Sequence, residues 1–298
     1  MIAILERGAP RILRRSTAIA AIAAMAAISM LAGCGKKGDE AFVNRDLQKS
    51  YRETTNKDLS SLSPNPERAI QTLDAAKKQD PENAMTYYLS AAAHVKKSDF
   101  VHVLAQLKAG NAASKCVEYQ SAAPAIHIFP GLARLRELAN RCVEGANSSK
   151  SGLNGAQSTE LLLEVRAMGT KLTHLEPLET IGPLAGVTDR MIANRGLVAL
   201  YRKSGRMVEA KLAQESVDAD QRWKQKAQAV VDSESPLDFG PRTLAVADKH
   251  GVTREEFRAF GQSKPLPDGA AKKIAETLLE LNAKERQLAE RILETLPR

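Results

Sequence analysis

Hydrophobic residues recur at spacings of three and four along most of the chain after residue 63, which is the period of an amphipathic helix. Ala69, Leu73 and Ala76 show this pattern first, and together they would form one apolar face. No segment alternates hydrophobic and polar residues with the period of two that is typical of a strand. The pattern therefore predicts an all-α fold.

Two consecutive helices are predicted between Pro81 and Gly110. Pro81 is expected to open the first helix, because the missing N–H of proline would have no partner in a first helical turn. The pattern breaks at Ser98 and Asp99, and a second helix begins at Phe100. The apolar faces of these helices would consist of Tyr87, Leu89, Ala91 and Val95, and of Phe100, Leu104 and Leu107. We expect a helical hairpin in which small residues such as Ala91 lie where helices cross.

The order of aromatic and small residues in this region resembles the tetratricopeptide repeat. Ala69, Leu73, Ala76 and Pro81 match the second half of one repeat, and Tyr87, Ala91, Phe100, Leu107 and Gly110 match most of the next. His94 and Val103 depart from the repeat, which usually has tyrosine and alanine at these positions. A second fragment, 197–217, is similar through Tyr201, Gly205, Met207 and Ala210. The resemblance implies a solenoid of stacked helix pairs. The alternative is an irregular helical bundle, because small-residue hairpins arise wherever helices pack closely.

Further helices are predicted outside these fragments. They cover residues 131–144 and 158–175 between the fragments, and residues 242–250, 253–260 and 270–293 in the last third of the chain. Thr253 and Glu256 have the spacing of a capping box, in which each side chain bonds a backbone N–H near the other residue. The last helix carries Ile274, Leu278, Leu281, Leu288 and Ile292 near one face.

The amino-terminal segment has the pattern of an export signal. Four arginines, Arg7, Arg11, Arg14 and Arg15, precede the stretch 16–31, which contains no charge. This stretch is shorter than the roughly 20 apolar residues that a membrane-spanning helix needs. A charged start followed by a short apolar run is instead typical of a signal peptide.

Leu31, Ala32 and Gly33 precede Cys34, and this order resembles the lipobox of bacterial lipoproteins. The resemblance implies that residues 1–33 are removed and that lipid on Cys34 anchors the protein to a membrane, since two or more acyl chains give stable anchoring. Gly35 and Lys36 follow the cysteine instead of the aspartate that favours the inner membrane, so we expect the outer membrane, facing the periplasm.

Four segments follow from these patterns. Residues 1–33 form the signal peptide, 34–62 the lipidated cysteine and a polar tether, 63–232 a helical repeat-like domain, and 233–298 a C-terminal helical segment. Removing the signal leaves 39 basic and 34 acidic residues, so the net charge falls from +8 to +5 over 265 residues. This charge is scattered, whereas nucleic-acid-binding proteins usually cluster basic residues on one face. We therefore expect no nucleic-acid partner.

Cys116 and Cys142 remain beside the lipidated cysteine. Export to an oxidising compartment would permit a disulfide between them, and closing a loop of about 27 residues would stabilise the fold by roughly 3.5 kcal/mol. The alternative is that both are small buried hydrophobic residues.

No motif for catalysis, metal binding or a cofactor is recognisable. The histidines His94, His102, His127, His174 and His250 lack the spacing of known zinc motifs. We therefore expect no catalytic residue, no metal and no cofactor. The interpretation that remains is a membrane-anchored helical scaffold, not an enzyme, that binds another envelope protein or a peptide. The alternative is a cell-envelope enzyme, such as a hydrolase or lyase acting on peptidoglycan.

Overall fold

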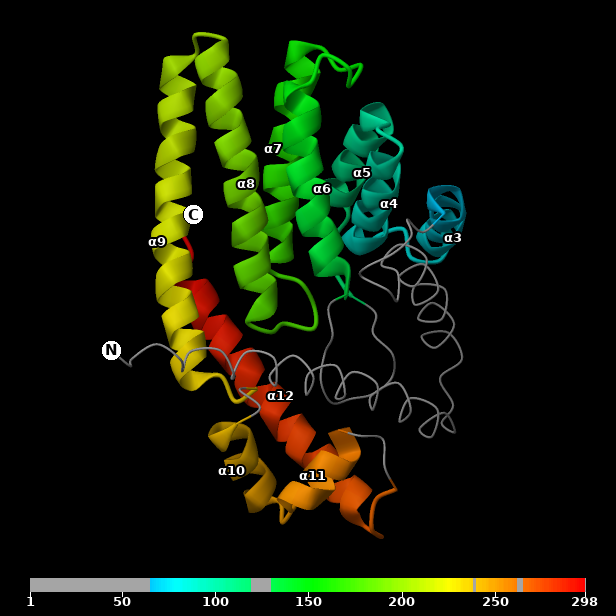
Figure 1. Cartoon of the computed structure of the whole chain (residues 1–298), viewed down its shortest axis with the longest axis vertical. Helices are drawn as coiled ribbons and strands as arrows, with labels where there is room; N and C mark the ends of the chain where they lie inside the picture. Colours follow the sequence, from blue (N-terminus) through cyan, green and yellow to red (C-terminus); the bar gives the residue numbers. More distant parts are fainter. Residues whose placement is uncertain (1–64, 119–129, 238–239, 262–264, 298) are drawn as a thin grey trace, which may run out of the picture. The chain divides into compact units, whose positions relative to one another are not determined.

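The computed structural model of the chain describes residues 65–118, 130–237, 240–261 and 265–297. These residues form ten α-helices and no β-strand, which confirms the all-α prediction (Figure 1). Cys34 and the segments predicted as a signal peptide and a polar tether lie outside the described residues. The helices are α3 (Pro66–Gln79), α4 (Ala84–Lys96), α5 (Phe100–Ala112), α6 (Pro130–Asn147), α7 (Gly155–Leu172), α8 (Ile181–Lys203), α9 (Met207–Glu234), α10 (Pro241–Lys249), α11 (Arg254–Gly261) and α12 (Ala270–Glu294).

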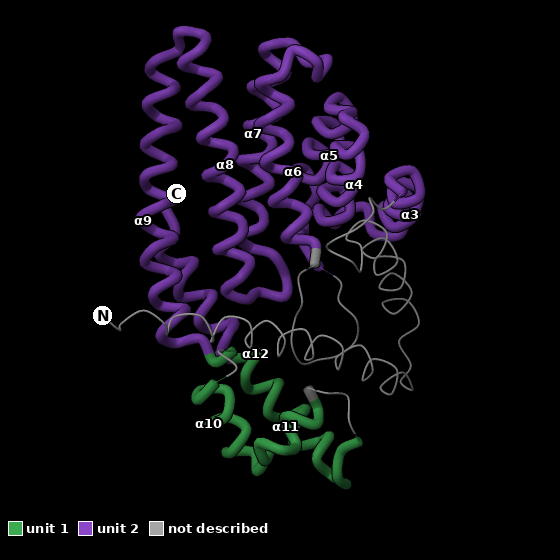
Figure 2. The backbone as a smooth tube through the Cα atoms, in the orientation of Figure 1, with its two compact units in different colours: residues 1–37, 121–126, 236–283 green, residues 38–120, 127–235, 284–298 purple. Residues whose placement is uncertain are grey.

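The described residues divide into two compact units (Figure 2). Unit 1 contains Pro236–Ala283, and unit 2 contains the remaining described residues, including those from Lys284 onward. The boundary therefore falls inside α12, whose first half belongs to unit 1 and whose second half belongs to unit 2. Each unit is described below by itself.

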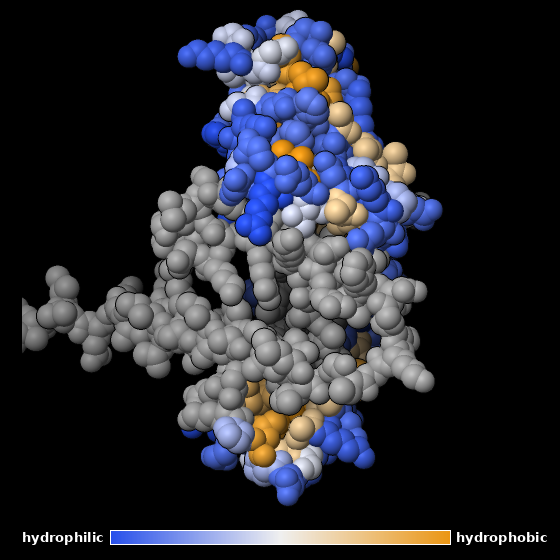
Figure 3. Space-filling view, turned by 90° about the vertical axis from the view of Figure 1, so that its right-hand side faces the viewer, coloured by the Kyte–Doolittle hydropathy of each residue, from blue (hydrophilic) through white to orange (hydrophobic). Residues whose placement is uncertain are grey.

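Unit 2 is a layered array in which each helix packs mainly on its neighbours along the chain. Helices α3, α4 and α5 pack in sequence, α5 packs on α7, and α8 lies between α7 and α9 (Figure 1). Helix α6 contacts α4, α7 and α8. One continuous apolar core runs through all these helices, from Leu73 in α3 to Ala213 in α9. The face that carries α3 to α5 is largely hydrophilic, with a few separate apolar groups (Figure 3).

The predicted hairpin at 81–110 is present as α4 and α5, and Ala91 is fully buried in it. The expectation that Pro81 opens the first helix is wrong, because α4 begins at Ala84. Asn83 caps this helix, its side chain accepting a hydrogen bond from the Met85 N–H at 3.2 Å. The helix thus starts three residues later than expected, and the same Asn83 side chain also bonds Val117 from a distant part of the chain.

Helices α7 and α8 approach each other closely at Gly169 and Gly186. A β-carbon on Gly169 would lie 2.7 Å from the carbonyl oxygen of Gly186, so only glycine fits there. This backbone contact fixes how α8 lies against α7.

Unit 1 holds α10, α11 and the first half of α12. Gly251 turns the chain between α10 and α11 with a φ of 67°, a left-handed conformation that favours glycine. The capping box predicted at the start of α11 is confirmed, with the Glu256 N–H bonding the Thr253 hydroxyl at 3.2 Å and the Thr253 N–H bonding the Glu256 carboxylate at 2.7 Å. A separate apolar cluster of α10, α11 and α12 residues forms the core of this unit.

Helix α12 buries all five of the residues predicted for its apolar face. Ile274, Leu278 and Leu281 join the core of unit 1, and Leu288 and Ile292 pack in unit 2 with Trp223 and other residues of α8 and α9. Within the described ranges, no helix combines the length and the apolar character needed to span a membrane.

Candidate functional site

Unit 2 contains a groove of about 1430 Å³. Helices α7, α8 and α9 line it together with the segments 114–117 and 293–297. Its lining includes Leu163, Arg166, Ala167, Thr170, Lys171, Arg190, Asn194, Leu212, Glu215, Ser216, Ala219, Asp220, Leu293 and Leu296.

The packing of α8 between α7 and α9 explains the shape of this groove. The lining residues of α7 and of α9 recur at spacings of three and four, so each helix presents one face to the groove. Helix α8 contributes only Arg190 and Asn194, which lie one turn apart. We infer that α7 and α9 form the walls and α8 the floor.

Asn194 is the most unusual residue of the floor. It is 1% exposed, and neither its amide nitrogen nor its amide oxygen has a hydrogen-bond partner among the described residues. An unpaired buried polar group costs about 1–3 kcal/mol. Most buried polar groups in proteins are hydrogen-bonded, so this one requires an explanation.

Asn83 shows how the same chain uses a buried carboxamide that is paired. Its Nδ2 donates to the carbonyl oxygen of Val117 at 2.9 Å, and its Oδ1 accepts from the Val117 N–H at 3.0 Å. One asparagine thus holds both backbone groups of a single residue in an extended segment. That segment, 115–118, also forms backbone bonds with Glu176 and contributes to the wall of the groove.

Two cationic side chains at the groove join neighbouring elements. Arg190 bonds both carboxylate oxygens of Asp220, with its Nε 2.8 Å from Oδ2, and joins α8 to α9. The Lys171 ammonium donates to the backbone carbonyls of Gly110, Asn111 and Ala113, and so joins α7 to the end of α5. These cations are therefore occupied by internal partners.

An exposed apolar strip leads into the groove along α9. Leu212 lines the groove with 58% of its surface exposed, and Met207 and Val208 in the preceding turn are 61% and 72% exposed. Exposed apolar groups that lie together often mark a surface for another molecule.

Asp220, which is paired with Arg190, lines the groove, whereas the other buried acidic residues of unit 2 lie away from it. Burial raises the pKa of Glu118 to about 8 and, against the opposing effect of Arg136, that of Asp189 to about 6. Glu285 accepts hydrogen bonds from the hydroxyls of Thr180 and Ser235. None of these three carboxyl groups lines the groove. Among the described residues, the groove thus offers no buried, unpaired carboxyl group of the kind expected for the alternative enzyme.

Cys116 and Cys142 are both free, buried thiols in the structure. Burial raises the pKa of both thiols, that of Cys116 to about 12. Cys116 borders the groove, and Cys142 of α6 lies in the apolar core of unit 2. The third predicted site residue, Cys34, is outside the described residues.

Asn194 was not identified as a site residue from the sequence, because no motif or spacing in a single sequence marks it. An asparagine in a helix can face solvent, and only the packing of α7 and α9 on either side of α8 shows that this one is buried. Comparison of the chain with known protein families, curated proteins and solved structures finds no match.

Proposed function

We propose that this protein is a membrane-anchored scaffold of the cell envelope whose groove binds an extended segment of another protein. The observation that carries the proposal is the buried, unpaired carboxamide of Asn194 on the groove floor. Lipid on Cys34, as the lipobox resemblance implies, would hold the groove at a membrane surface.

The size of the groove favours a polypeptide over a metabolite. Its volume of about 1430 Å³ exceeds the roughly 300–1,000 Å³ of typical small-molecule pockets. Five separate segments line it, so a ligand of some length is needed to contact them all.

The Asn194 carboxamide favours an extended ligand over a helical one. In an extended chain the N–H and C=O of one residue point to the same side and can bond the same partner, as Val117 does with Asn83. In a helix these groups bond one another. A bound strand would therefore pair with Asn194, which requires the carboxamide to turn into the groove, because both of its polar atoms are covered in the structure. Its alternate apolar side chains would contact Leu212 and the neighbouring apolar wall.

A substitution that separates binding from stability tests the proposal. Asn194→Leu removes the unpaired amide at similar volume, so the free energy of unfolding should rise by about 1 kcal/mol or more. Peptide binding should weaken at least tenfold, because two hydrogen bonds of about 1 kcal/mol each are lost. The probe is an array of 12-residue synthetic peptides that vary in their spacing of leucines. Fluorescence anisotropy then measures the affinity of those that bind.

Asn83→Leu is the matched control, since it removes a buried asparagine whose amide is paired. Its free energy of unfolding should fall, not rise. A second control uses the selected peptide with single N-methylated residues, and one methyl position should abolish binding because the backbone N–H is required. If no peptide binds, or if Asn194→Leu binds as tightly as the wild type, the groove does not have this function.

A further inference from the structure

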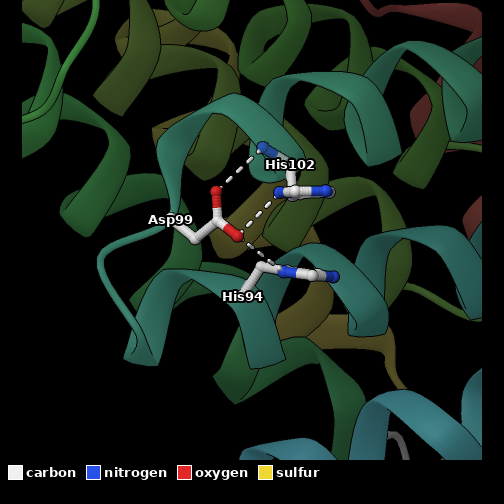
Figure 4. A group of neighbouring side chains, drawn as sticks. All are labelled: His94, Asp99 and His102. Carbon is white, nitrogen blue, oxygen red and sulfur yellow. Dashed lines mark hydrogen bonds and ion pairs between the residues drawn. The ribbon is translucent and has the colours of Figure 1, made fainter.

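At the turn between α4 and α5, the side chains of two histidines lie next to the carboxylate of one aspartate (Figure 4). His94 lies in the last turn of α4, and His102 lies in the first turn of α5. Asp99 between them is the N-cap of α5, where its Oδ1 accepts from the His102 N–H at 3.3 Å. Ser98, with a φ of 57°, takes the left-handed conformation that reverses the chain at this point.

Both imidazoles direct Nδ1 at the same carboxylate oxygen. Oδ2 of Asp99 lies 2.7 Å from Nδ1 of His102 and 3.5 Å from Nδ1 of His94 (Figure 4). The two rings are stacked, with centroids 5.0 Å apart and planes 9° from parallel. One ligand atom from each residue lies within 4.8 Å of the others.

Capping alone does not account for this arrangement. The cap uses Oδ1 of Asp99 and a backbone N–H, and it needs neither imidazole. Nδ1 of His94 is buried and makes no hydrogen bond among the described residues, although its side chain is only 12% exposed. The sequence fills this position with histidine where the tetratricopeptide repeat usually has tyrosine.

We infer that His94, Asp99 and His102 form a binding site for a divalent transition-metal ion, best fitted to Zn²⁺. Bonds of about 2.0–2.2 Å to nitrogen and oxygen place the ligands of tetrahedral Zn²⁺ about 3.3 Å apart. The distance of 3.5 Å from Asp99 Oδ2 to His94 already has this spacing, and that of 2.7 Å to His102 reaches it when the proton between His102 and Asp99 leaves and the side chains part by about 0.6 Å. The two stacked imidazoles must also turn about their Cβ–Cγ bonds, because a metal bound to Nδ1 lies in the plane of each ring. Two imidazoles and one carboxylate favour zinc, copper or nickel over magnesium or calcium, which prefer oxygen ligands.

The site lies open on one side. The side chain of His102 is 62% exposed and that of Asp99 is 32% exposed, so an ion can enter from solvent and keep water as a fourth ligand. Lys77 of α3 also acts electrostatically on His94, and its ammonium is paired with Asp74 at 2.7 Å. Bound metal would tie the end of α4 to the start of α5.

Titration of the tag-free full chain in detergent with ZnSO₄, after treatment with a chelator, tests the site. Calorimetry should show one ion per chain. Asp99→Asn keeps a good N-cap, and His102→Ala changes a mostly exposed side chain, so both variants should fold as the wild type does by circular dichroism. Each should bind Zn²⁺ at least tenfold more weakly. His174→Ala, at another exposed histidine, should bind as the wild type does.

Cobalt(II) distinguishes this site from the cysteines. Its absorption should show visible d–d bands without the near-ultraviolet charge transfer of thiolate ligands, and Asp99→Asn should lose these bands. Thiolate charge transfer, or equal Zn²⁺ affinity in the wild type, Asp99→Asn and His102→Ala, would overturn the inference.

Discussion

Gly169 of α7 and Gly186 of α8 face each other with no side chain between their backbones. A β-carbon on Gly169 would lie 2.6 Å from the backbone nitrogen of Arg190, and one on Gly186 would lie 2.7 Å from that of Thr173. Backbone atoms in packed helices cannot rotate away as a flexible side chain can. The same crossing places Arg190 and Asn194 of α8 beside the α7 wall of the groove.

Gly186→Ala should therefore lower the free energy of unfolding by about 1–3 kcal/mol, the usual cost of overpacking. Gly155→Ala is the control, because a β-carbon there meets no atom within 4 Å. It should leave stability unchanged or raise it slightly through helix propensity. Urea midpoints at unchanged slope measure both variants. Equal midpoints would mean that α7 and α8 do not touch here.

Ala91→Leu should lower the free energy of unfolding by about 1–3 kcal/mol, again through overpacking, because Ala91 of α4 is fully buried in the core. Ala105→Leu on the exposed side of α5 should change the free energy of unfolding by less than about 0.5 kcal/mol. If both variants unfold at the same urea concentration, Ala91 is not at a helix crossing.

The buried carboxyl group of Glu118 predicts a dependence of stability on pH. Its pKa of about 8 in the folded protein lies above the value of about 4.3 in an unfolded chain. The folded state therefore favours the protonated acid. The stability that the protonated Glu118 carboxyl group contributes is complete below pH 4 and is lost as pH rises through about 8.

Glu118→Gln imitates the protonated acid and should be the more stable protein in alkali. The free energy of unfolding of this variant, relative to that of the wild type, should grow by about 1.4 kcal/mol for each pH unit between about 4.5 and 8. Thermal unfolding at pH 5 and pH 8 measures the difference. Glu137→Gln, at an exposed glutamate, should show no such trend. A constant difference across this range would show that Glu118 is ionised in the folded protein.

Cys34→Ala should abolish metabolic labelling with palmitate, since the thiol is the expected site of acylation. The product should be uncleaved or soluble. Cys116→Ala removes a buried thiol of the folded part and should remain labelled and bound to membranes. Labelled Cys34→Ala protein would contradict the lipoprotein prediction.

Much of the helical layout was predictable because local chemistry determines it. The break at Ser98 and Asp99 and the capping box of Thr253 and Glu256 both depend on residues near one another in the chain. The prediction at Pro81 was wrong because Asn83, two residues later, is the N-cap of α4, and this asparagine is also held by Val117 from a distant part of the chain.

The sites were less predictable because they depend on which helix faces meet. His94 and His102 are separated by a turn that was predicted, yet their shared carboxylate appears only when the last turn of α4 faces the first turn of α5. Asn194 gives no local signal, since its missing partners are a property of the packing around it. The Gly169 and Gly186 contact likewise joins two helices whose sequences do not reveal it.

The division of α12 between two cores has a consequence for the timing of folding during synthesis. The core of unit 1 needs Leu278 and Leu281, and the cluster around Trp223 needs Leu288 and Ile292. Leu293 and Leu296 also line the groove. These late residues must therefore be synthesised before either core or the groove is complete. Until then the nascent chain exposes the apolar residues of the earlier helices that these late residues later cover.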